Sequence, residues 1–295
     1  MLSASNRTVH IIVRYAFAPL LAIVGGAAII ALAPLSKPGV VVVVIAAVVV
    51  SFVAEWAVPF DEEWNRSRGD RIRDAVHAIV NESSTAVGVL AVPAVVSVAP
   101  TLTSWPDGVP FLLQVVFAVV VLDIGITVAH WWSHRNDLLW RFHAVHHSVT
   151  RMYGFNGLVK HPVHQTIETT AGMLPLVLLG VSGDVATAVA GLVALQLLLQ
   201  HSNVDYRVGL LRRWVALNEG HRLHHVGRMP DGDVNFGLFL LIWDRFLGSY
   251  TDPTGRSVAA DELGIAGRAA YPVDYVDQLR EPFRRHPTDR VNAGE

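Results

Sequence analysis

The sequence contains no cysteine at all. Disulfides, iron–sulfur clusters, thiolate zinc sites and cysteine nucleophiles are therefore excluded, and any metal ion must be bound through nitrogen or oxygen. Charged residues are also scarce, at 16% of the chain, whereas about a quarter is usual in soluble domains. The formal net charge of -2 argues against nucleic-acid binding, which requires a basic surface. With 52% hydrophobic residues, the composition indicates a membrane protein without a nucleic-acid partner.

Four apolar segments are predicted to cross a bilayer, which needs about 20 apolar residues. We expect helices, because unpaired backbone groups are costly in lipid, even where a valine run would indicate strands in a soluble protein. The first segment is interpreted as a retained span and not a signal peptide, because no small-residue cleavage site follows it. The predicted spans are residues 9–34, 39–60, 84–100 and 110–132.

Two shorter apolar stretches, 170–181 and 185–200, are too short for a full crossing each. We expect them to form a re-entrant or interfacial hairpin, or one further pair of tilted helices. The predicted fold class is all-α: an integral membrane protein with about four transmembrane helices, an interfacial helical hairpin and a cytosolic histidine-rich helical cap. The expected regions are 1–60 (transmembrane helices 1 and 2), 61–83 (cytosolic connector), 84–132 (transmembrane helices 3 and 4), 133–250 (the histidine-rich cap with the membrane hairpin) and 251–295 (peripheral C-terminal tail).

Arginines indicate how the chain is oriented in the membrane. The 61–83 connector is arginine-rich, the 35–38 turn has only Lys37, and the 101–109 loop has neither lysine nor arginine. The positive-inside rule then places the N-terminus, the connector and everything after residue 133 in the cytoplasm. Glu55, near the end of the second span, is interpreted as an exposed carboxylate at a helix end.

Eight of the 14 histidines fall in three short clusters, HWWSH, HAVHH and HRLHH. Their spacings are i, i+4 in the first cluster and i, i+3, i+4 in the other two. Residues three and four apart share one face of a helix, so each cluster could direct two or three imidazoles toward one point. The eight residues are His130, His134, His143, His146, His147, His221, His224 and His225.

This spacing is typical of metal ligands. A single buried histidine is usually a hydrogen-bonded core residue, but three clusters are not explained in that way. Neutral imidazole binds iron, copper, zinc and nickel, and imidazole ligands alone do not choose between them. Eight ligands are too many for one ion of ordinary coordination number, so the sequence predicts two metal ions.

Asp123 lies seven residues before His130, two helical turns back on the same face. A carboxylate inside a membrane span is costly and usually functional. Two interpretations stay open: Asp123 is a hydrogen-bond partner of a ligand histidine, or it pairs with a neighbouring helix.

Seven short motifs then occur in a familiar order: HWWSH, LLWRFHAVHHS, HP, QHSN, HRLHH, NFG and WDRFLGSY. In order and spacing, the sequence resembles the fatty acid hydroxylase/sterol desaturase superfamily of integral-membrane di-metal oxygenases. The resemblance covers roughly residues 123–250. It implies two iron ions, O2 as co-substrate, and a cytosolic cap over the membrane helices.

The resemblance also implies roles for residues outside the three clusters. His201 matches the isolated histidine before the last box and is expected to be a metal ligand. His161 matches the His-Pro position, with a role as ligand or as partner of a ligand. His164 stands where relatives often have an acidic residue, so its role is open between the same two. Asn235 and Asp244 match positions that orient ligands or hold the fold.

The predicted function is hydroxylation of a C–H bond of a lipid by O2 and two electrons. The chain shows no flavin, haem or iron–sulfur motif, so an external donor is implied: a ferredoxin, cytochrome or reductase. A lipid desaturase of the same family is the nearest alternative. A membrane zinc hydrolase would need a glutamate beside its histidines, as in HExxH, and none is present. A haem electron carrier and a non-catalytic scaffold are further alternatives. The substrate stays open among fatty acyl chains, sterols, ether lipids and carotenoids.

Overall fold

A computed structural model describes residues 4–100, 105–227, 231–268 and 270–284, and these residues form helices without a β-strand. The first half of the chain supplies long helices: α1 (Ala4–Leu20), a π-helical turn (Leu21–Gly25), α2 (Gly26–Leu32), α3 (Lys37–Ala57), α4 (Arg71–Val98) and α5 (Phe111–Ser133). The second half supplies α6 (Asp137–His147), α7 (Pro162–Leu178), α8 (Gly183–His201), α9 (Asn218–His224), α10 (Ile242–Leu247) and α11 (Tyr275–Arg280). Five short helical turns complete it: Glu62–Asn65, Gly154–Leu158, Gly209–Arg213, Ala260–Glu262 and Glu281–Phe283. The predicted all-α fold is confirmed.

Five of the described helices are long and apolar enough to cross a membrane. Four correspond to the predicted spans, although α4 begins at Arg71, inside the segment expected to be a connector. The fifth is α8, the second of the two stretches expected to form either a hairpin or a further pair of tilted helices. The reason is local: Ser182 caps α8 by accepting a hydrogen bond from the Val185 amide, so the helix starts early and runs 19 residues. The described residues thus contain five candidate spans, where the sequence predicts about four.

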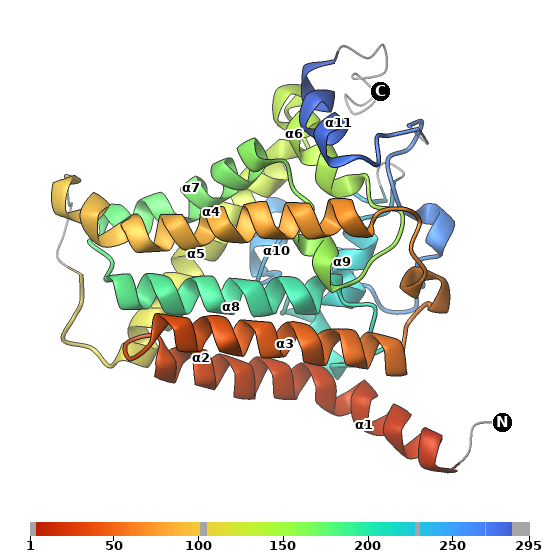
Figure 1. Cartoon of the computed structure of the whole chain (residues 1–295), viewed down its shortest axis with the longest axis horizontal. Helices are drawn as coiled ribbons and strands as arrows, with labels where there is room; N and C mark the ends of the chain where they lie inside the picture. The colour runs from red at the N-terminus through yellow and green to blue at the C-terminus, as the bar shows by residue number, and fades with distance from the viewer. Residues whose placement is uncertain (1–3, 101–104, 228–230, 269, 285–295) are drawn as a thin grey trace.

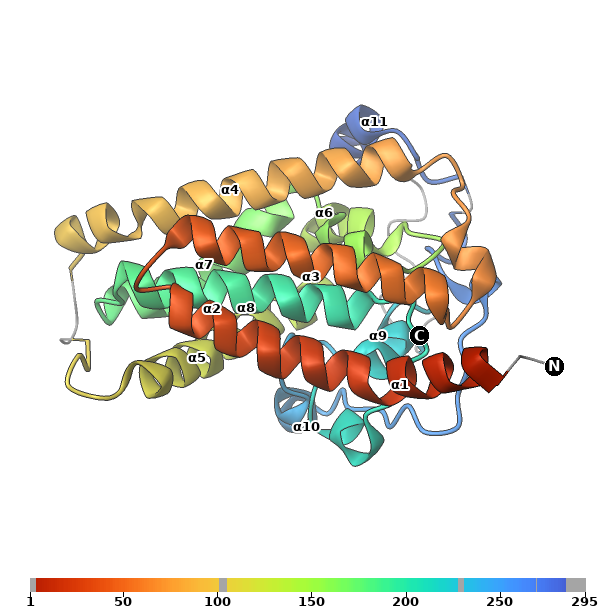
Figure 2. The same cartoon turned by 60° about the horizontal axis from the view of Figure 1, so that its bottom comes forward.

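The long helices lie side by side, with α8 packed among α2, α3, α4 and α5 (Figures 1 and 2). The turns that follow α2 and α7 lie at one end of this layer, shown at the left of Figure 1. The opposite end carries the start of α1, the connector after α3 and the short helix α9, while α6 and α11 lie above the layer, over the first half of α4. The histidine-bearing elements therefore lie toward the same end of the molecule as the arginine-rich connector. The first residues of the 101–109 loop, 101–104, lie outside the described residues.

Helices α5 and α7 cross at two glycines. A Cβ atom on Gly125 would overlap the backbone carbonyl of Ala171, and one on Gly172 would press against Leu122 and Ile126. Small residues at helix crossings let two backbones approach closely in a membrane. This approach fixes α7 against the helix that delivers the first two cluster histidines.

The interpretation of Glu55 as an exposed carboxylate is wrong. Its side chain is buried, and its Oε1 accepts hydrogen bonds from the amides of Gly154 at 2.8 Å and Asn203 at 3.1 Å. A carboxylate at the end of α3 therefore ties that helix to the two segments that follow α6 and α8. Sequence position alone could not reveal these two distant amide donors.

Part of the expected peripheral tail packs against the body. Gln278 on α11 is fully buried; its Oε1 accepts a hydrogen bond from His77 Nε2 (2.9 Å), and its Nε2 donates to the Ser148 hydroxyl (3.1 Å). His77 Nδ1 also lies 3.0 Å from the Lys160 carbonyl, so both ring nitrogens have polar neighbours away from the histidine clusters. Residues 285–295 of the expected tail lie outside the described residues.

Candidate metal centre

One buried group of five histidines forms where the end of α5 meets α6 and α9. One ring nitrogen from each residue lies within 4.8 Å of all the others. The Nε2 atom of His147 is 3.1 Å from that of His134 and 3.0 Å from that of His143. We call this the five-histidine group; its members are His130, His134, His143, His147 and His224.

A second buried group lies beside it and draws on α6, α8 and α9. The Nε2 atom of His221 is 3.0 Å from that of His201 and 3.1 Å from that of His225. The rings of His147 and His225, one from each group, stack with centroids 4.7 Å apart, so the groups adjoin. We call this the four-histidine group; its members are His146, His201, His221 and His225.

The two HxxHH motifs are each divided between the groups. On α6 the i, i+4 pair His143 and His147 enters the five-histidine group, and His146 enters the other. After α9 begins, the i, i+4 pair His221 and His225 enters the four-histidine group, and His224 enters the five-histidine group. Each cluster therefore directs two of its imidazoles into one group, and the third histidine of each HxxHH motif enters the other group. Residues i+3 and i+4 differ by about 100° around a helix, so a motif buried between two sites serves both.

Backbone carbonyls fix which ring nitrogen faces each group. The Nδ1 atoms of His130, His146 and His201 lie 2.9, 3.1 and 3.2 Å from the carbonyls of Phe236, Val159 and Leu197. A carbonyl only accepts, so in these neutral rings Nδ1 carries the proton and Nε2 carries the lone pair. Nδ1 of His224 similarly lies 2.9 Å from the Val234 carbonyl.

These lone pairs face one another without a donor between them. The Nε2 atoms of His146 and His201 are 3.4 Å apart, although both are the unprotonated nitrogens of their rings. The Nε2 atoms of His130 and His224 are buried and have no hydrogen-bond partner in the described part of the chain. Two lone pairs in contact repel, and a cation between them removes the repulsion.

The spacing fits metal coordination. Metal–imidazole bonds of about 2.0–2.1 Å at angles between 90° and 109° place two nitrogens about 2.9–3.4 Å apart. Five Nε2–Nε2 pairs, two in the five-histidine group and three in the four-histidine group, are 3.0–3.4 Å apart. The donor set of neutral imidazoles suits a transition-metal ion such as iron or zinc.

Burial also keeps the rings in the form that binds metal. Burial, followed by repulsion between neighbouring rings, lowers the pKa of seven imidazoles well below 6.5, so these rings are neutral near pH 7. The seven are His134, His143, His146, His147, His221, His224 and His225.

Asn235 and Asp244 hold the segment that orients two of the ligands. Asp244 accepts hydrogen bonds from the amides of Phe236 (2.7 Å) and Gly237 (2.9 Å), and Asn235 adopts a left-handed backbone with φ of 56°. The amide group of Asn235 bridges to Thr251, at 3.0 Å in both directions. The carbonyls of this segment meet His130 and His224, so both residues act on the site through the backbone.

Asp123 contacts no histidine. Its carboxylate accepts hydrogen bonds from the amides of Phe239 (2.8 Å) and Leu240 (3.0 Å) and from the Trp243 indole (2.8 Å). It therefore anchors the segment just after Phe236 to α5. Of the two open interpretations, pairing with a neighbouring element describes this geometry, and the effect on His130 is indirect.

His161 and His164 differ in their distance from the site. His161 caps α7, accepting a hydrogen bond from the Val163 amide, and lies outside both groups. His164 lies against the five-histidine group, with its ring centroid 4.3 Å from that of His143. With Glu168 it forms a third cluster of ligand atoms that shares His143.

Two acidic residues near the histidine groups are not among the site residues predicted from the sequence. Glu168 is buried and forms an ion pair with Lys160 at 2.5 Å, and its carboxylate lies 3.7 Å from His164 Nδ1. Asp233 lies 3.4 Å from His134 Nδ1, which leaves Nε2 of that ring for the group. The available signal was weak: a glutamate four residues after His164 in an apolar helix, and one aspartate among several in a loop.

The fold and the site together define a class: an all-α integral membrane protein with a candidate binuclear histidine centre. The chain belongs to the fatty acid hydroxylase family. The family model described as fatty acid hydroxylase matches residues 115–249, which include every histidine of both groups. The predicted superfamily is confirmed.

Three curated relatives illustrate the family. The chain is 32% identical to an ornithine lipid hydroxylase, OlsE, of Rhizobium tropici over 253 residues, 83% of this chain and 75% of the relative. It is 28% identical over 142 residues to sphinganine C4-monooxygenase 1 of Arabidopsis thaliana, covering 46% of this chain and 54% of that protein. It is 28% identical over 142 residues to alkylglycerol monooxygenase of Danio rerio, covering 48% of this chain and 31% of that protein. No solved structure matches the chain. Hydroxylases and monooxygenases are oxidoreductases, so the predicted enzyme class is confirmed.

Proposed function

We propose that the two histidine groups bind two iron ions and that the chain hydroxylates a C–H bond of a membrane lipid. The observation that carries the proposal is the set of nine buried histidines whose ring nitrogens gather in two adjoining groups. Lone pairs that face one another at 3.4 Å support a cation in the four-histidine group. In the five-histidine group, the unpartnered Nε2 atoms of His130 and His224 support a second.

Iron is supported by the family and by the chemistry of the substrate. An unactivated C–H bond offers neither an acidic proton nor a leaving group, so acid–base or nucleophilic catalysis cannot begin there. When bound, an iron pair supplies oxidation by O2 with two electrons. The overall balance is R–H plus O2, two electrons and two protons, giving R–OH and water.

The protein contributes orientation and a dry environment. Carbonyls of Phe236, Val159 and Leu197 hold the rings of three ligands in one tautomer. The nine histidines are all buried, so bulk water is kept from the groups. Fixed ligands in a water-excluded site need little reorganisation during a reaction.

We propose that the lipid substrate reaches the candidate metal centre from the bilayer. His130 closes a candidate span, α5, and His201 closes another, α8, so ligands from both groups lie at the membrane boundary. The similarity to an ornithine lipid hydroxylase supports an amino-acid-containing lipid as the first substrate to test. Sphingoid bases and ether lipids follow, from the names of the other relatives.

We further propose that the centre faces the cytoplasm and receives electrons from an external donor. The arginine-rich connector and the histidine-bearing helices lie toward the same end of the molecule (Figure 1). The positive-inside rule then favours the cytoplasm for that end. A ferredoxin, a cytochrome or a reductase on that side would supply the two electrons.

Product analysis of paired variants tests this function. Lipids from cells that express the wild-type chain, His146→Ala or His224→Ala are compared by mass spectrometry, with His10→Ala as control because His10 lies outside both groups. We expect an oxygen-containing product from the wild type and from His10→Ala, and none from the other two variants. A product that has lost two hydrogens would indicate a desaturase. Full activity of both histidine variants would exclude the proposal. Activity that persists without O2 would also exclude it and would favour a hydrolase.

A further inference from the structure

A second candidate site lies on the other side of α9 from the histidines. A cavity of about 280 Å³ opens between α9, the turn at Gly209–Arg213 and the segment 253–258. This is room for a small headgroup, since one water molecule in the liquid occupies about 30 Å³. Four arginines and one glutamate line it: Arg207, Arg212, Arg222, Arg256 and Glu219.

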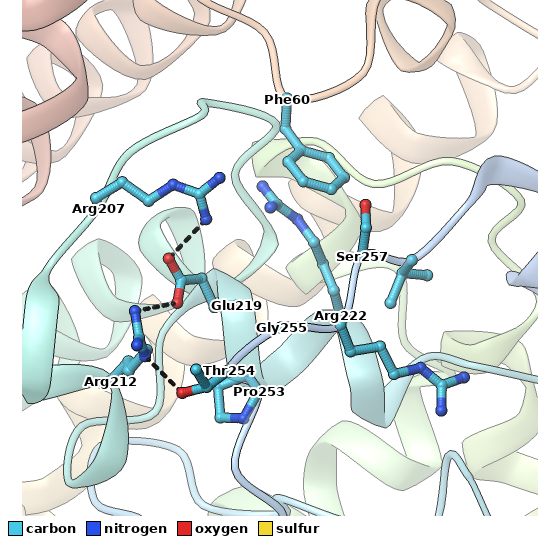
Figure 3. Close-up of a pocket in the computed structure, with 11 residues that line it drawn as sticks. Phe60, Arg207, Arg212, Glu219, Arg222, Pro253, Thr254, Gly255 and Ser257 are labelled. Carbon is cyan, nitrogen blue, oxygen red and sulfur yellow. Dashed lines mark hydrogen bonds and ion pairs between the residues drawn. The ribbon is translucent and has the colours of Figure 1, made fainter.

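Three of the four arginines have carboxylate partners. Arg207 and Arg212 point at Glu219, with N–O distances of 2.9 and 3.5 Å (Figure 3). Arg256 pairs with Glu262 at 3.2 Å. Arg207 also pairs with Asp205 at 3.0 Å, and Arg256 with Asp231 at 3.6 Å, so carboxylates balance the charges of these three arginines.

Arg222 differs from the other three. Only 3% of the residue is exposed, and no carboxylate forms an ion pair with it among the described residues. One guanidinium nitrogen donates to the Ser202 carbonyl at 2.8 Å, while Nε has no hydrogen-bond partner. Asp205 and Glu219 act on this charge only from beyond ion-pair distance. A buried charge without an ion-pair contact is costly, so an anion bound beside Arg222 would stabilise it.

The surroundings of Arg222 direct it toward the cavity. Its guanidinium lies 3.7 Å from the centre of the Phe60 ring, which covers one of its faces. In Figure 3 the side chains of Arg207 and Arg222 point toward one another across the cavity. Arg207 is already paired with Glu219 and Asp205, so Arg222 is the lining arginine whose charge favours an additional anion in this space. Guanidinium groups bind phosphate and carboxylate through paired hydrogen bonds.

The cavity lies at the membrane boundary. The Arg207 amide donates to the Arg14 carbonyl at 2.7 Å, and Arg14 stands near the start of the first candidate span. Phe60 follows the end of α3, the second candidate span, by three residues. Lipid headgroups occupy this level, and arginines there attract anionic lipids.

We propose that this cavity binds the phosphate or carboxylate of a lipid headgroup, at a site distinct from the histidine groups. Glu219 and Arg222 come from the same short helix as His221 and His224 but line the cavity on another face. Occupancy would therefore hold α9 in place. The inference concerns an anion site and depends neither on the metal nor on the reaction proposed above.

Binding of short-chain lipids to the full chain in detergent tests the proposal. Dihexanoyl phosphatidic acid, uncharged dihexanoylglycerol and inorganic phosphate are titrated into the wild type, Arg222→Gln and Arg212→Gln. Arg213→Gln is the matched control, because Arg213 is adjacent, pairs with Asp252 and does not line the cavity. Size-exclusion profiles and thermal unfolding establish that each variant is folded.

We expect phosphatidic acid to bind the wild type about tenfold more tightly than dihexanoylglycerol, and each cavity variant to lose about tenfold, as for loss of a charge-assisted hydrogen bond. Arg213→Gln should bind as the wild type does. Inorganic phosphate that binds as tightly as the lipid would support the anion site but identify a soluble anion as its occupant. If Arg222→Gln does not fold, Arg212→Gln decides. Equal binding of charged and uncharged lipid, or wild-type affinity in the folded cavity variants, would overturn the proposal.

Discussion

The Asp123 carboxylate accepts a hydrogen bond from the Trp243 indole at 2.8 Å, although 120 residues separate them in the sequence. The same carboxylate accepts hydrogen bonds from the backbone amides of Phe239 and Leu240. This one side chain therefore joins α5 to the segment whose Phe236 carbonyl orients His130. We therefore expect Asp123 to support the candidate metal site through this segment.

Replacing Asp123 tests this connection. Asp123→Asn keeps the shape but turns an amide group toward hydrogen-bond donors, so we expect a loss of about 1.5–3 kcal/mol of stability, the range for hydrogen bonds to charged groups. Metal bound by the five-histidine group should also decrease. Thermal unfolding and metal analysis measure the two effects, and Asp107→Asn, at an exposed position, is the control. A variant with wild-type stability and metal content would show that the anchor is dispensable.

The Gly125–Gly172 crossing predicts a steric effect. Gly125→Ala introduces a methyl group into the Ala171 carbonyl and should push α7 away from α5, so we expect poor folding or loss of metal. Gly88→Ala is the matched control, because a Cβ there meets nothing within 4 Å. That control should be neutral or stabilising by about 0.5–1 kcal/mol, the usual difference between glycine and alanine inside a helix. Equal yields and melting points for both variants would contradict the crossing.

The buried pair Lys160–Glu168 predicts strong coupling between two substitutions. Glu168→Gln leaves the Lys160 ammonium without its partner and should cost about 3–5 kcal/mol, whereas removal of both charges is often tolerated. We therefore expect Lys160→Met combined with Glu168→Gln to be more stable than Glu168→Gln alone. Unfolding midpoints of the single and double variants in one detergent form the test. Additive losses would mean that the pair is not coupled.

Metal removal should destabilise the chain reversibly. An ion that binds only the folded state at a thousandfold excess over its Kd adds about 4 kcal/mol per site. Without it, the lone pairs of His146 and His201 face one another directly. We expect a chelator to lower the unfolding midpoint, Fe²⁺ to restore it, and Mg²⁺, which prefers oxygen ligands, to have no effect. A midpoint that the chelator leaves unchanged would count against a structural contribution from metal.

The sequence predicted most of the centre because histidine spacing is a local property. The i, i+3, i+4 pattern identified the residues of both HxxHH motifs, and the resemblance added His201. The division of each motif between two groups depends on which helices pack on either side, and no local pattern encodes that. The role of Glu168 is hidden for the same reason. Its partner Lys160 lies just before α7, which begins at Pro162, and only the folded structure shows that the two side chains meet.

The membrane helices show the same limit. Hydropathy located four spans, but the length of α8 depends on a cap at Ser182 and on burial among four other helices. Glu55 looked like a helix-end carboxylate because its two amide donors, Gly154 and Asn203, come from distant segments. Long-range partners of single polar residues are what sequence patterns cannot supply.

The number of iron ions per chain is the most direct test of whether each histidine group binds one ion. The wild-type chain, His224→Ala from the five-histidine group and His221→Ala from the four-histidine group are purified gently and their iron is quantified against protein. We expect about two iron ions per wild-type chain and a clear decrease in each variant, because each substitution removes a candidate ligand of a different ion. A wild-type ratio near zero, or a ratio that neither substitution changes, would contradict this expectation.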